Sequence, residues 1–384
     1  MAYDFDAVVE RRSGDSYKWN IYAGRDVIPM PVADMDFKAP PAVIAALQER
    51  LDHGVFGYAD ATPAVFEAIG EMLFADYGWS IDPSWLVWSP GLEVALNVFC
   101  RLAASPRARV MCSTPIYPPF LSAPRNTGRK LDAVPLSLDS DGYRFDAAAV
   151  DAAMTPETEL FMACNPQNPS GHVMTRGELE SLAQVCLKHD LLICSDEIHC
   201  GLVLDADKHH IPLATLSPEV AKRTITLMSP SKTYNLAGLM WAFAIIPDAG
   251  LRRRFKRAAR GIITEVNAFG YAACVAAYRD SQDWHNGLLD YLRGNRDLVE
   301  SVVGDLPGMW MPHVEATYLA WLDCRGATLS DDPVGGFERA GIGLSDGSHF
   351  GAPGFVRLNF GCPRSVLKEG LQRIRNALSS TEGL

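Results

Sequence analysis

The sequence predicts an α/β protein built on a mostly parallel β-sheet, followed by a smaller α+β unit. Three observations predict this fold: short apolar runs, amphipathic stretches between several of them, and a change of pattern after about residue 285. Buried parallel strands read as continuous apolar runs, and strands that alternate with helices are typical of a sheet covered on both faces. The predicted strands are WLVWS (85–89), RVMCS (109–113), LDAVPL (131–136), LFMAC (160–164), LLICSD (191–196), TITLMS (224–229) and WAFAIIP (241–247).

Helices are predicted where apolar residues recur at helical spacing. LEVALNVFCRLAA follows the first strand, and TRGELESLAQVCLKHD begins with a Thr175–Glu178 capping box. Beyond residue 285, a long helix leads to EATYLAWLD, FVRLNFG and a last helix, SVLKEGLQRIRNAL. We expect an N-terminal segment (1–45) that packs with the small domain, a large domain (46–284) and a small C-terminal domain (285–384).

Composition excludes several classes of protein. The 384 residues are 48% hydrophobic and 21% charged, and the net charge of −11 argues against nucleic acid or an anionic membrane as partner. No apolar stretch approaches the roughly 20 residues that span a bilayer, and MAYDFDAVVE shows no signal-peptide pattern. The nine cysteines include no C-x-x-C pair and read as reduced thiols, so we expect a cytoplasmic protein. DADKHH (205–210) is expected to be a solvated loop, and no metal site is expected.

Functional side chains are expected directly after the strands, because sites in open α/β sheets lie outside the carboxyl ends of their strands. Tyr117, Asn168, Asp196 and Lys232 each come at or shortly after the end of a predicted strand. A glycine turn at Gly91 opens the first helix, whose free backbone N–H groups suit a phosphate. One edge of the sheet therefore offers an anion site, an aromatic ring, an amide, a carboxylate and a lysine.

These groups together match the needs of pyridoxal phosphate. A lysine amine binds the cofactor aldehyde, and the ring withdraws electrons when its nitrogen stays protonated. A carboxylate beside that nitrogen favours the charged form. The sequence thus indicates a cofactor site of this kind at the strand ends.

In these residues the chain resembles a known family, the class I/II aminotransferase group of fold-type I pyridoxal-phosphate enzymes. Within that group it is most similar to the MalY/PatB-type cystathionine β-lyases, which are C–S lyases. The resemblance implies a large domain with a mostly parallel seven-stranded sheet, and it covers essentially the whole chain. It rests on eight ordered motifs: PVADMDF (31–37), GVFGY (54–58), TPIYPPF (114–120), NPQNPSG (165–171), SDEIH (195–199), SPSKTYNLAGL (229–239), ATYLAWLD (316–323) and VRLNFGCPR (356–364).

The resemblance implies a role for each matching residue at the cofactor ring. Lys232 would bind the cofactor and move the proton at the substrate Cα, and Asp196 would face the ring nitrogen. Asn168 would bond the ring oxygen, with His199 near it. Tyr117 would stack on the ring.

Further residues would hold the phosphate, the partner subunit and the substrate. Ser229 and the backbone N–H groups of Gly91, Leu92 and Glu93 would bind the phosphate, and only the backbone of Glu93 suits that role because its carboxylate would repel a phosphate. Tyr58 would reach the phosphate in the partner subunit's site, which implies a homodimer with shared active sites. The predicted substrate-binding residues are Arg357, which would clamp the α-carboxylate, Asp34 and Asn168.

The expected activity is β-elimination from cystathionine or another S-substituted L-cysteine to a thiol, pyruvate and ammonia. Three alternatives stay open: an aminotransferase, an enzyme of oxidative decarboxylation acting on an S-substituted cysteine, and a ligand-binding regulator that retains the cofactor. Met240 and Trp241 stand where smaller or polar residues are more usual in the family, so the natural substrate is left open.

Overall fold

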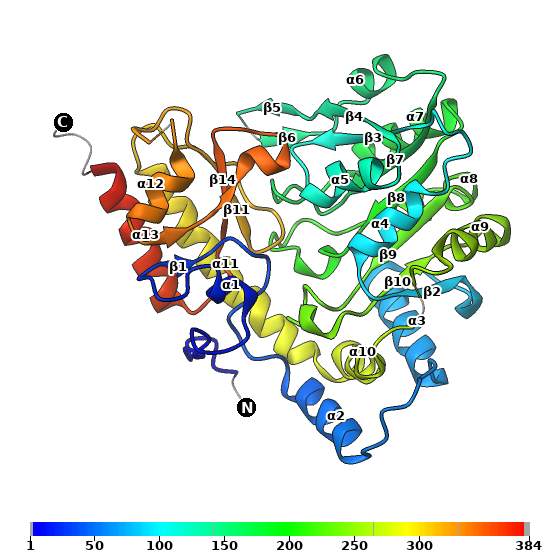
Figure 1. The fold of residues 1–384 in the computed structure, drawn as a ribbon, viewed down its shortest axis with the longest axis horizontal. Coiled ribbons are helices and arrows are strands. Elements are labelled where there is room, and N and C mark those ends of the chain that lie inside the picture. The colour runs from blue at the N-terminus through cyan, green and yellow to red at the C-terminus, as the bar shows by residue number, and fades with distance from the viewer. Residues whose placement is uncertain (1–2, 141, 264, 330, 380–384) are drawn as a thin grey trace.

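A seven-stranded sheet forms the centre of the computed structural model, which describes residues 3–140, 142–263, 265–329 and 331–379 (Figure 1). All seven predicted segments are strands of this sheet. Four pairings are parallel, while β10 runs antiparallel to both neighbours, so the mostly parallel sheet is confirmed. Across the sheet the order is β2 (Leu86–Ser89), β10 (Ala242–Ile245), β9 (Thr224–Met228), β8 (Leu192–Asp196), β7 (Thr158–Cys164), β3 (Arg109–Thr114) and β4 (Lys130–Pro135).

Helices cover both faces of the sheet, as the continuous apolar strands require. Successive residues of β3 point to opposite faces, so Val110 and Cys112 are buried with α4 and α9 whereas Met111 is buried with α7. The capping box of α7 is present, with Thr175 Oγ1 accepting from Glu178 N at 3.2 Å. The helices of this part are α3 (Pro63–Tyr77), α4 (Leu92–Cys100), α5 (Pro118–Asn126), α6 (Ala147–Ala152), α7 (Arg176–Lys188), α8 (Pro218–Ala221), α9 (Ala249–Ala259) and α10 (Ala268–Asp280).

The last hundred residues build a smaller layer on a three-stranded antiparallel sheet of order β11-β14-β13. Its long helix starts at Gln282, before the predicted domain boundary, and the division into domains stays a prediction. Its elements are α11 (Gln282–Gly304), β11 (Leu319–Asp323), α12 (Pro333–Arg339), β12 (Ile342–Gly343), β13 (Ser345–Asp346), β14 (Phe355–Asn359) and α13 (Arg364–Ser379).

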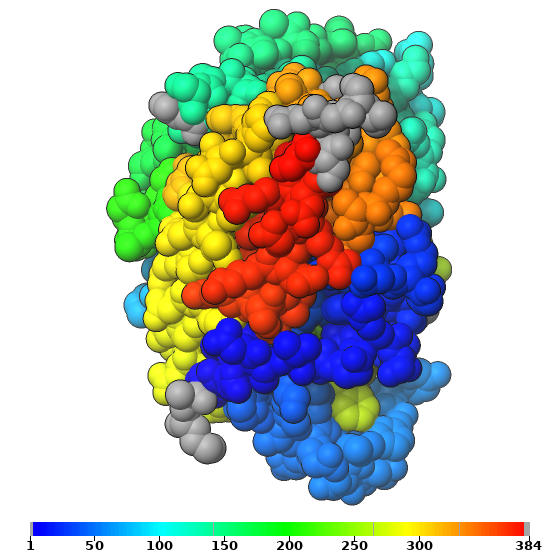
Figure 2. Space-filling model, turned by 90° about the vertical axis from the view of Figure 1, so that its left-hand side faces the viewer, coloured from blue at the N-terminus to red at the C-terminus, as the bar shows by residue number. Residues whose placement is uncertain are grey.

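The N-terminal segment lies against this smaller layer. β1 (Ile28–Pro29) pairs in parallel with β12, so Ile28 stands opposite Ile342. Figure 2 shows the blue N-terminal residues next to the red α13. The remaining elements are α1 (Tyr17–Asn20), α2 (Pro41–Asp52) and a hairpin of β5 (Ser137–Asp139) and β6 (Gly142–Arg144). Among the described residues, no helix combines the length and apolar character needed to cross a bilayer.

Candidate active site

A cavity of about 660 Å³ opens at the carboxyl ends of the parallel strands, between the large sheet and the smaller layer. The strand ends bring polar side chains to its floor, and β14 brings Arg357 to its wall. Ten of the twelve predicted site residues line this one cavity. They are Gly91, Leu92, Glu93, Tyr117, Asn168, Asp196, His199, Ser229, Lys232 and Arg357.

Lys232 lies in the turn that follows β9, where its side chain is half-buried. Its Nζ donates a hydrogen bond of 2.7 Å to the carbonyl oxygen of Ala33, which comes from the N-terminal segment. Burial, together with the charge of Arg357, lowers the pKa of the lysine amine to about 8. A larger share of neutral, nucleophilic amine is therefore available near neutral pH than a surface lysine provides.

Asp196 ends β8 and is buried on the cavity floor. Its Oδ1 accepts from the Ile198 amide at 3.1 Å, and burial raises its pKa to about 7. Behind it, the buried Glu197 pairs with His210 Nε2 at 2.8 Å. A cation bound in the cavity next to Asp196 stabilises the charged form of this carboxylate.

Arg357 is buried, and its guanidinium is only partly satisfied by the protein. Nη1 donates to Asn168 Oδ1 at 2.9 Å and Nη2 to the Pro31 carbonyl at 2.8 Å, whereas the buried Nε has no acceptor among the described residues. Burial lowers the pKa of Arg357 to about 10, and no carboxylate of the described residues forms an ion pair with it. A buried guanidinium with a free donor is a binding site for an anion.

His199 presents a second buried nitrogen without a partner. No described group bonds its Nδ1, and burial together with the charges of Lys232 and Arg357 lowers its pKa to about 3. The ring is therefore neutral at physiological pH. It can accept or donate one hydrogen bond to a ligand in the cavity.

The opposite end of the cavity suits a phosphate. Gly91 precedes α4 without a side-chain cap, and this leaves the first amides of the helix free toward the cavity. Ser229 Oγ donates to the Trp241 carbonyl at 2.8 Å and accepts from Ser231 N at 3.0 Å. The Glu93 side chain is exposed, and after burial it is the strongest cause of the raised pKa of Tyr117.

Taken together, these features fit pyridoxal phosphate. The cavity provides a lysine of lowered pKa, a buried carboxylate that forms no ion pair with the described residues, two unpartnered nitrogens and a helix N-terminus. Tyr117 lines the same cavity. The individual roles given above to the site residues stay predictions.

Two predicted site residues lie elsewhere. Tyr58 is 96% exposed and lines a different hollow beside Lys256 and Tyr271, so within one chain it does not reach Lys232. Asp34 pairs with Arg11 at 2.9 Å and Lys18 at 3.1 Å, and it does not line the cavity. A substrate-binding role for Asp34 also stays a prediction.

Tyr318 does not line the cavity but contacts groups of the site, and sequence reasoning missed it although the motif ATYLAWLD contains it. Its hydroxyl donates to the Ala33 carbonyl at 3.0 Å, the same oxygen that accepts from Lys232. Its ring meets His199 edge-on at 6.2 Å. The preceding Thr317 is fully buried with φ at 77°, a strained conformation for a β-branched residue.

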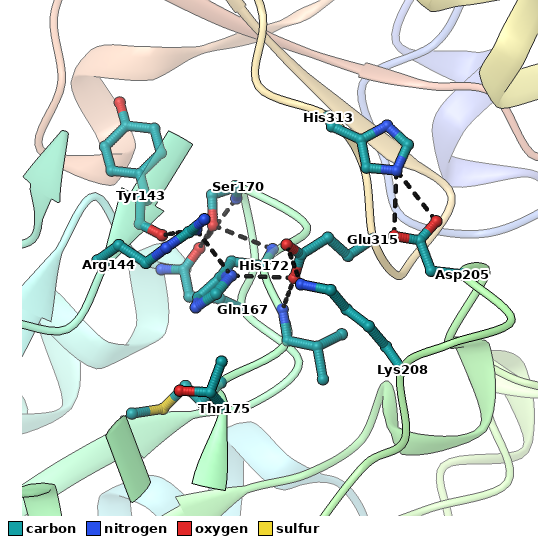
Figure 3. Close-up of polar contacts among 12 residues, drawn as sticks. Tyr143, Arg144, Gln167, Ser170, His172, Thr175, Asp205, Lys208, His313 and Glu315 are labelled. Carbon is teal, nitrogen blue, oxygen red and sulfur yellow. Dashed lines mark hydrogen bonds and ion pairs between the residues drawn. The ribbon is translucent and has the colours of Figure 1, made fainter. Parts of the chain in front are cut away.

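The loop that carries Asn168 is fixed by a buried polar cluster (Figure 3). His172 lies between Glu315 Oε2 and Glu178 Oε1, each 3.0 Å from a ring nitrogen, and Arg144 Nη1 lies 3.3 Å from Nδ1. Lys208 forms an ion pair with the other oxygen of Glu315. This cluster joins the loop after β7 to the segment that leads into Tyr318.

The same cluster corrects the interpretation of DADKHH as a solvated loop. Asp205 pairs with Arg296 at 2.5 Å and His313 at 3.0 Å, and His210 is buried against Glu197. Asp207 and His209 are exposed as expected, whereas Asp205, Lys208 and His210 face the protein. Their partners lie far away in the sequence, so composition alone could not show it.

The His172 cluster predicts a pH-dependent contribution to stability. Burial disfavours the imidazolium, but the hydrogen bonds that it donates to Glu178 and Glu315 outweigh this effect and raise the pKa of His172. The imidazolium makes its full contribution to the free energy of unfolding below its unfolded-state pKa of about 6.5. This contribution is lost as the pH rises through the raised pKa of the folded state. The two carboxylates, with pKa values of about 2, contribute above their unfolded value of about 4.3 and lose their share as the pH falls.

We expect His172→Gln to lower Tm by about 4 °C at pH 6, because Glu178 and Glu315 lose the imidazolium that lies between them. The difference from wild type should shrink as the pH rises past the raised pKa of His172. Thermal melts at a series of pH values measure it, with the exposed His209→Gln as control. A Tm difference that stays constant from pH 6 to pH 10 would contradict the expectation.

Comparisons with known proteins agree with this geometry. A family model described as aminotransferase class I and II matches residues 25–374. Cystathionine beta-lyase PatB of Bacillus subtilis (strain 168) is 37% identical over 98% of this chain and 100% of that protein. A crystal structure of OvoB is 44% identical with a TM-score of 0.96, over 98% of this chain and 100% of that one. Cystalysin from Treponema denticola, whose crystal structure contains pyridoxal 5'-phosphate, is 30% identical with a TM-score of 0.94, over 99% of this chain and 100% of that one.

Proposed function

The chain belongs to the aminotransferase class I and II family, and we propose that it is a C–S β-lyase that converts S-substituted L-cysteines, cystathionine among them, to a thiol, pyruvate and ammonia. The predicted family is thereby confirmed, and the protein is a pyridoxal-phosphate-dependent, cystathionine β-lyase-like enzyme. The substrate is the proposed part. The proposed substrate class is supported by the cavity that Lys232, Asp196 and Arg357 share, together with relatives named as β-lyases.

The side chains supply binding and proton transfer. Pyridoxal phosphate, when bound, supplies an aldehyde that captures the substrate amine and a ring that withdraws electrons from the substrate Cα. Arg357 binds the α-carboxylate through its free donors, and Asp196 holds a positive charge at the ring nitrogen. Asn168 and His199 would hold the cofactor ring by hydrogen bonds.

Lys232 is the group that moves the proton. Its neutral amine takes the proton from Cα, and the C–S bond then breaks with its electron pair leaving on sulfur. The thiolate takes up a proton, and the remaining three-carbon fragment hydrolyses. Overall, one S-substituted cysteine and one water give one thiol, one pyruvate and one ammonia.

Product analysis of the purified holoenzyme tests this proposal. With L-cystathionine or S-methyl-L-cysteine and no keto acid, we expect thiol and pyruvate in equal amounts. An aminotransferase would need an added keto acid and would release no thiol. Oxygen uptake with release of carbon dioxide would instead indicate oxidative decarboxylation, and cofactor without turnover would indicate a regulator.

We also propose that the enzyme is a homodimer in which Tyr58 completes the phosphate site of the partner. Support comes from the 96% exposure of Tyr58 and from its neighbours Val55 and Phe56, which are each 61% exposed. Mixing the inactive variants Lys232→Ala and Tyr58→Ala under subunit exchange should restore activity, because each mixed dimer then has one intact site. Failure to recover activity in mixed dimers of confirmed composition would contradict shared sites.

A further inference from the structure

The N-terminal helix α1 forms one wall of the active-site cavity, which none of the sequence motifs indicated. Tyr17, Ile21 and Tyr22, called the α1 wall below, line the cavity that also contains Lys232 and Arg357. Tyr17 and Ile21 stand four positions apart and therefore share one face of the helical turn. The α1 wall and Arg357 line the same cavity.

The wall is exposed where a ligand would cover it. Tyr17 is 74% and Ile21 44% exposed, although both are large apolar side chains. Val334 and Leu344 from the smaller layer line the same cavity. A contiguous exposed apolar surface inside a binding cavity is typical of a ligand-binding surface.

Contacts with the rest of the protein hold the α1 wall in place, because a helix of four residues is not stable by itself. Lys18, on the inner side of α1, is 1% exposed, and its Nζ donates to Asp36 Oδ2 at 2.8 Å and to the Asp34 carbonyl at 3.0 Å. Trp19 Nε1 donates to Asp36 Oδ1 at 3.0 Å. Burying a lysine adds little net stability, but it fixes one position of the helix.

Tyr22 is fixed on the other side. A Cβ on Gly343 would come within 2.4 Å of the Tyr22 ring, so the ring packs directly on the backbone at the end of β12. The nearby polar groups already have bonds within the protein: Ser345 Oγ donates to the Pro31 carbonyl at 2.7 Å, and Asp346 Oδ1 accepts from Ser348 N at 2.8 Å. Apolar surface in the cavity thus comes from the α1 wall, Val334 and Leu344, and the same cavity also contains the polar side chains of Asp346 and His349.

We propose that the α1 wall is the subsite for the sulfur substituent, and that the enzyme prefers S-substituted cysteines whose substituent is large and apolar, such as an aromatic ring. This inference rests on the proposed lyase function and adds the substrate class to it. Anchored by Arg357, the substrate extends from Cβ through sulfur toward the wall. A ring placed there covers Tyr17 and Ile21 and removes apolar surface of both molecules from water.

The test compares S-benzyl-L-cysteine, S-methyl-L-cysteine and L-cystathionine by thiol release from the holoenzyme. Wild type is expected to favour S-benzyl-L-cysteine in kcat/KM over the other two. Tyr17→Ser and Ile21→Ser should each lower kcat/KM for S-benzyl-L-cysteine on the order of tenfold, mainly through KM, with less than about a twofold change for S-methyl-L-cysteine. Leu138→Ser, an exposed apolar residue on β5 outside the cavity, is the matched control.

Equal losses for both substrates, or no loss, would overturn the inference while thiol release still supported the lyase. Preference for cystathionine would also overturn it, since that substituent carries two charges. A change in oligomeric state without a change in selectivity would assign the wall to a subunit contact instead. Absence of thiol from all three substrates would refute the lyase function itself, a result distinct from the others.

Discussion

Lys232→Ala is expected to abolish thiol release, with a loss of at least about 10³-fold in kcat. The variant removes both the amine that binds the cofactor aldehyde and the base at the substrate Cα. No second lysine lines the described cavity to take its place. The visible absorbance of the covalently bound cofactor should disappear as well, and spectroscopy measures this without any turnover.

Two further variants separate the amine from its charge. Lys232→Arg keeps a positive charge but cannot become neutral, so it should be as inactive as the alanine variant. Lys368→Ala, at an exposed lysine of α13, should leave the spectrum and the rate unchanged. Peptide mapping after borohydride reduction should find the cofactor mass on the peptide of Lys232. A wild-type spectrum in Lys232→Ala would refute the assignment.

Arg357→Ala is expected to raise KM for amino-acid substrates, with kcat/KM falling on the order of 10²-fold and kcat changing little. The buried guanidinium has an unpartnered Nε, so a substrate carboxylate gains hydrogen bonds that water supplies poorly in this cavity. Steady-state kinetics with S-methyl-L-cysteine measure the division between KM and kcat.

Arg357 also holds Asn168 and the Pro31 carbonyl, so a control for damage to the site is needed. Arg357→Lys keeps the charge and loses the two-pronged geometry, and its kcat/KM should lie between those of wild type and the alanine variant. The cofactor spectrum should be unchanged in both. A loss confined to kcat, with KM at the wild-type value, would argue against carboxylate binding by Arg357.

The sheet could be predicted from the sequence because its strands are buried on both faces. LFMAC is apolar throughout and forms the end of β7, while TITLM forms β9 and contains no charged residue, although two buried threonines lie on one of its faces. The polar residues placed after those strands share a cavity because parallel strands end at one edge. Local patterns were sufficient for both conclusions.

The rest of the site depends on contacts between distant parts of the chain. The Ala33 carbonyl meets Lys232 across 199 positions, and Glu315 meets His172 across 143. Lys18 reads in the sequence as an ordinary surface lysine, and α1 has four residues, too few to show helical periodicity. Spacing and composition carry no signal for such contacts.

The N-terminal segment binds parts of the chain that are translated much later, because β1 pairs with β12. The Pro31 carbonyl accepts a hydrogen bond from Arg357, which is translated 326 positions later. At ~5–20 residues per second, a ribosome needs roughly 15 to 65 s to deliver that donor. Throughout this interval the nascent N-terminal segment lacks its docking surface, so the catalytic pocket can form only after β14 has been translated.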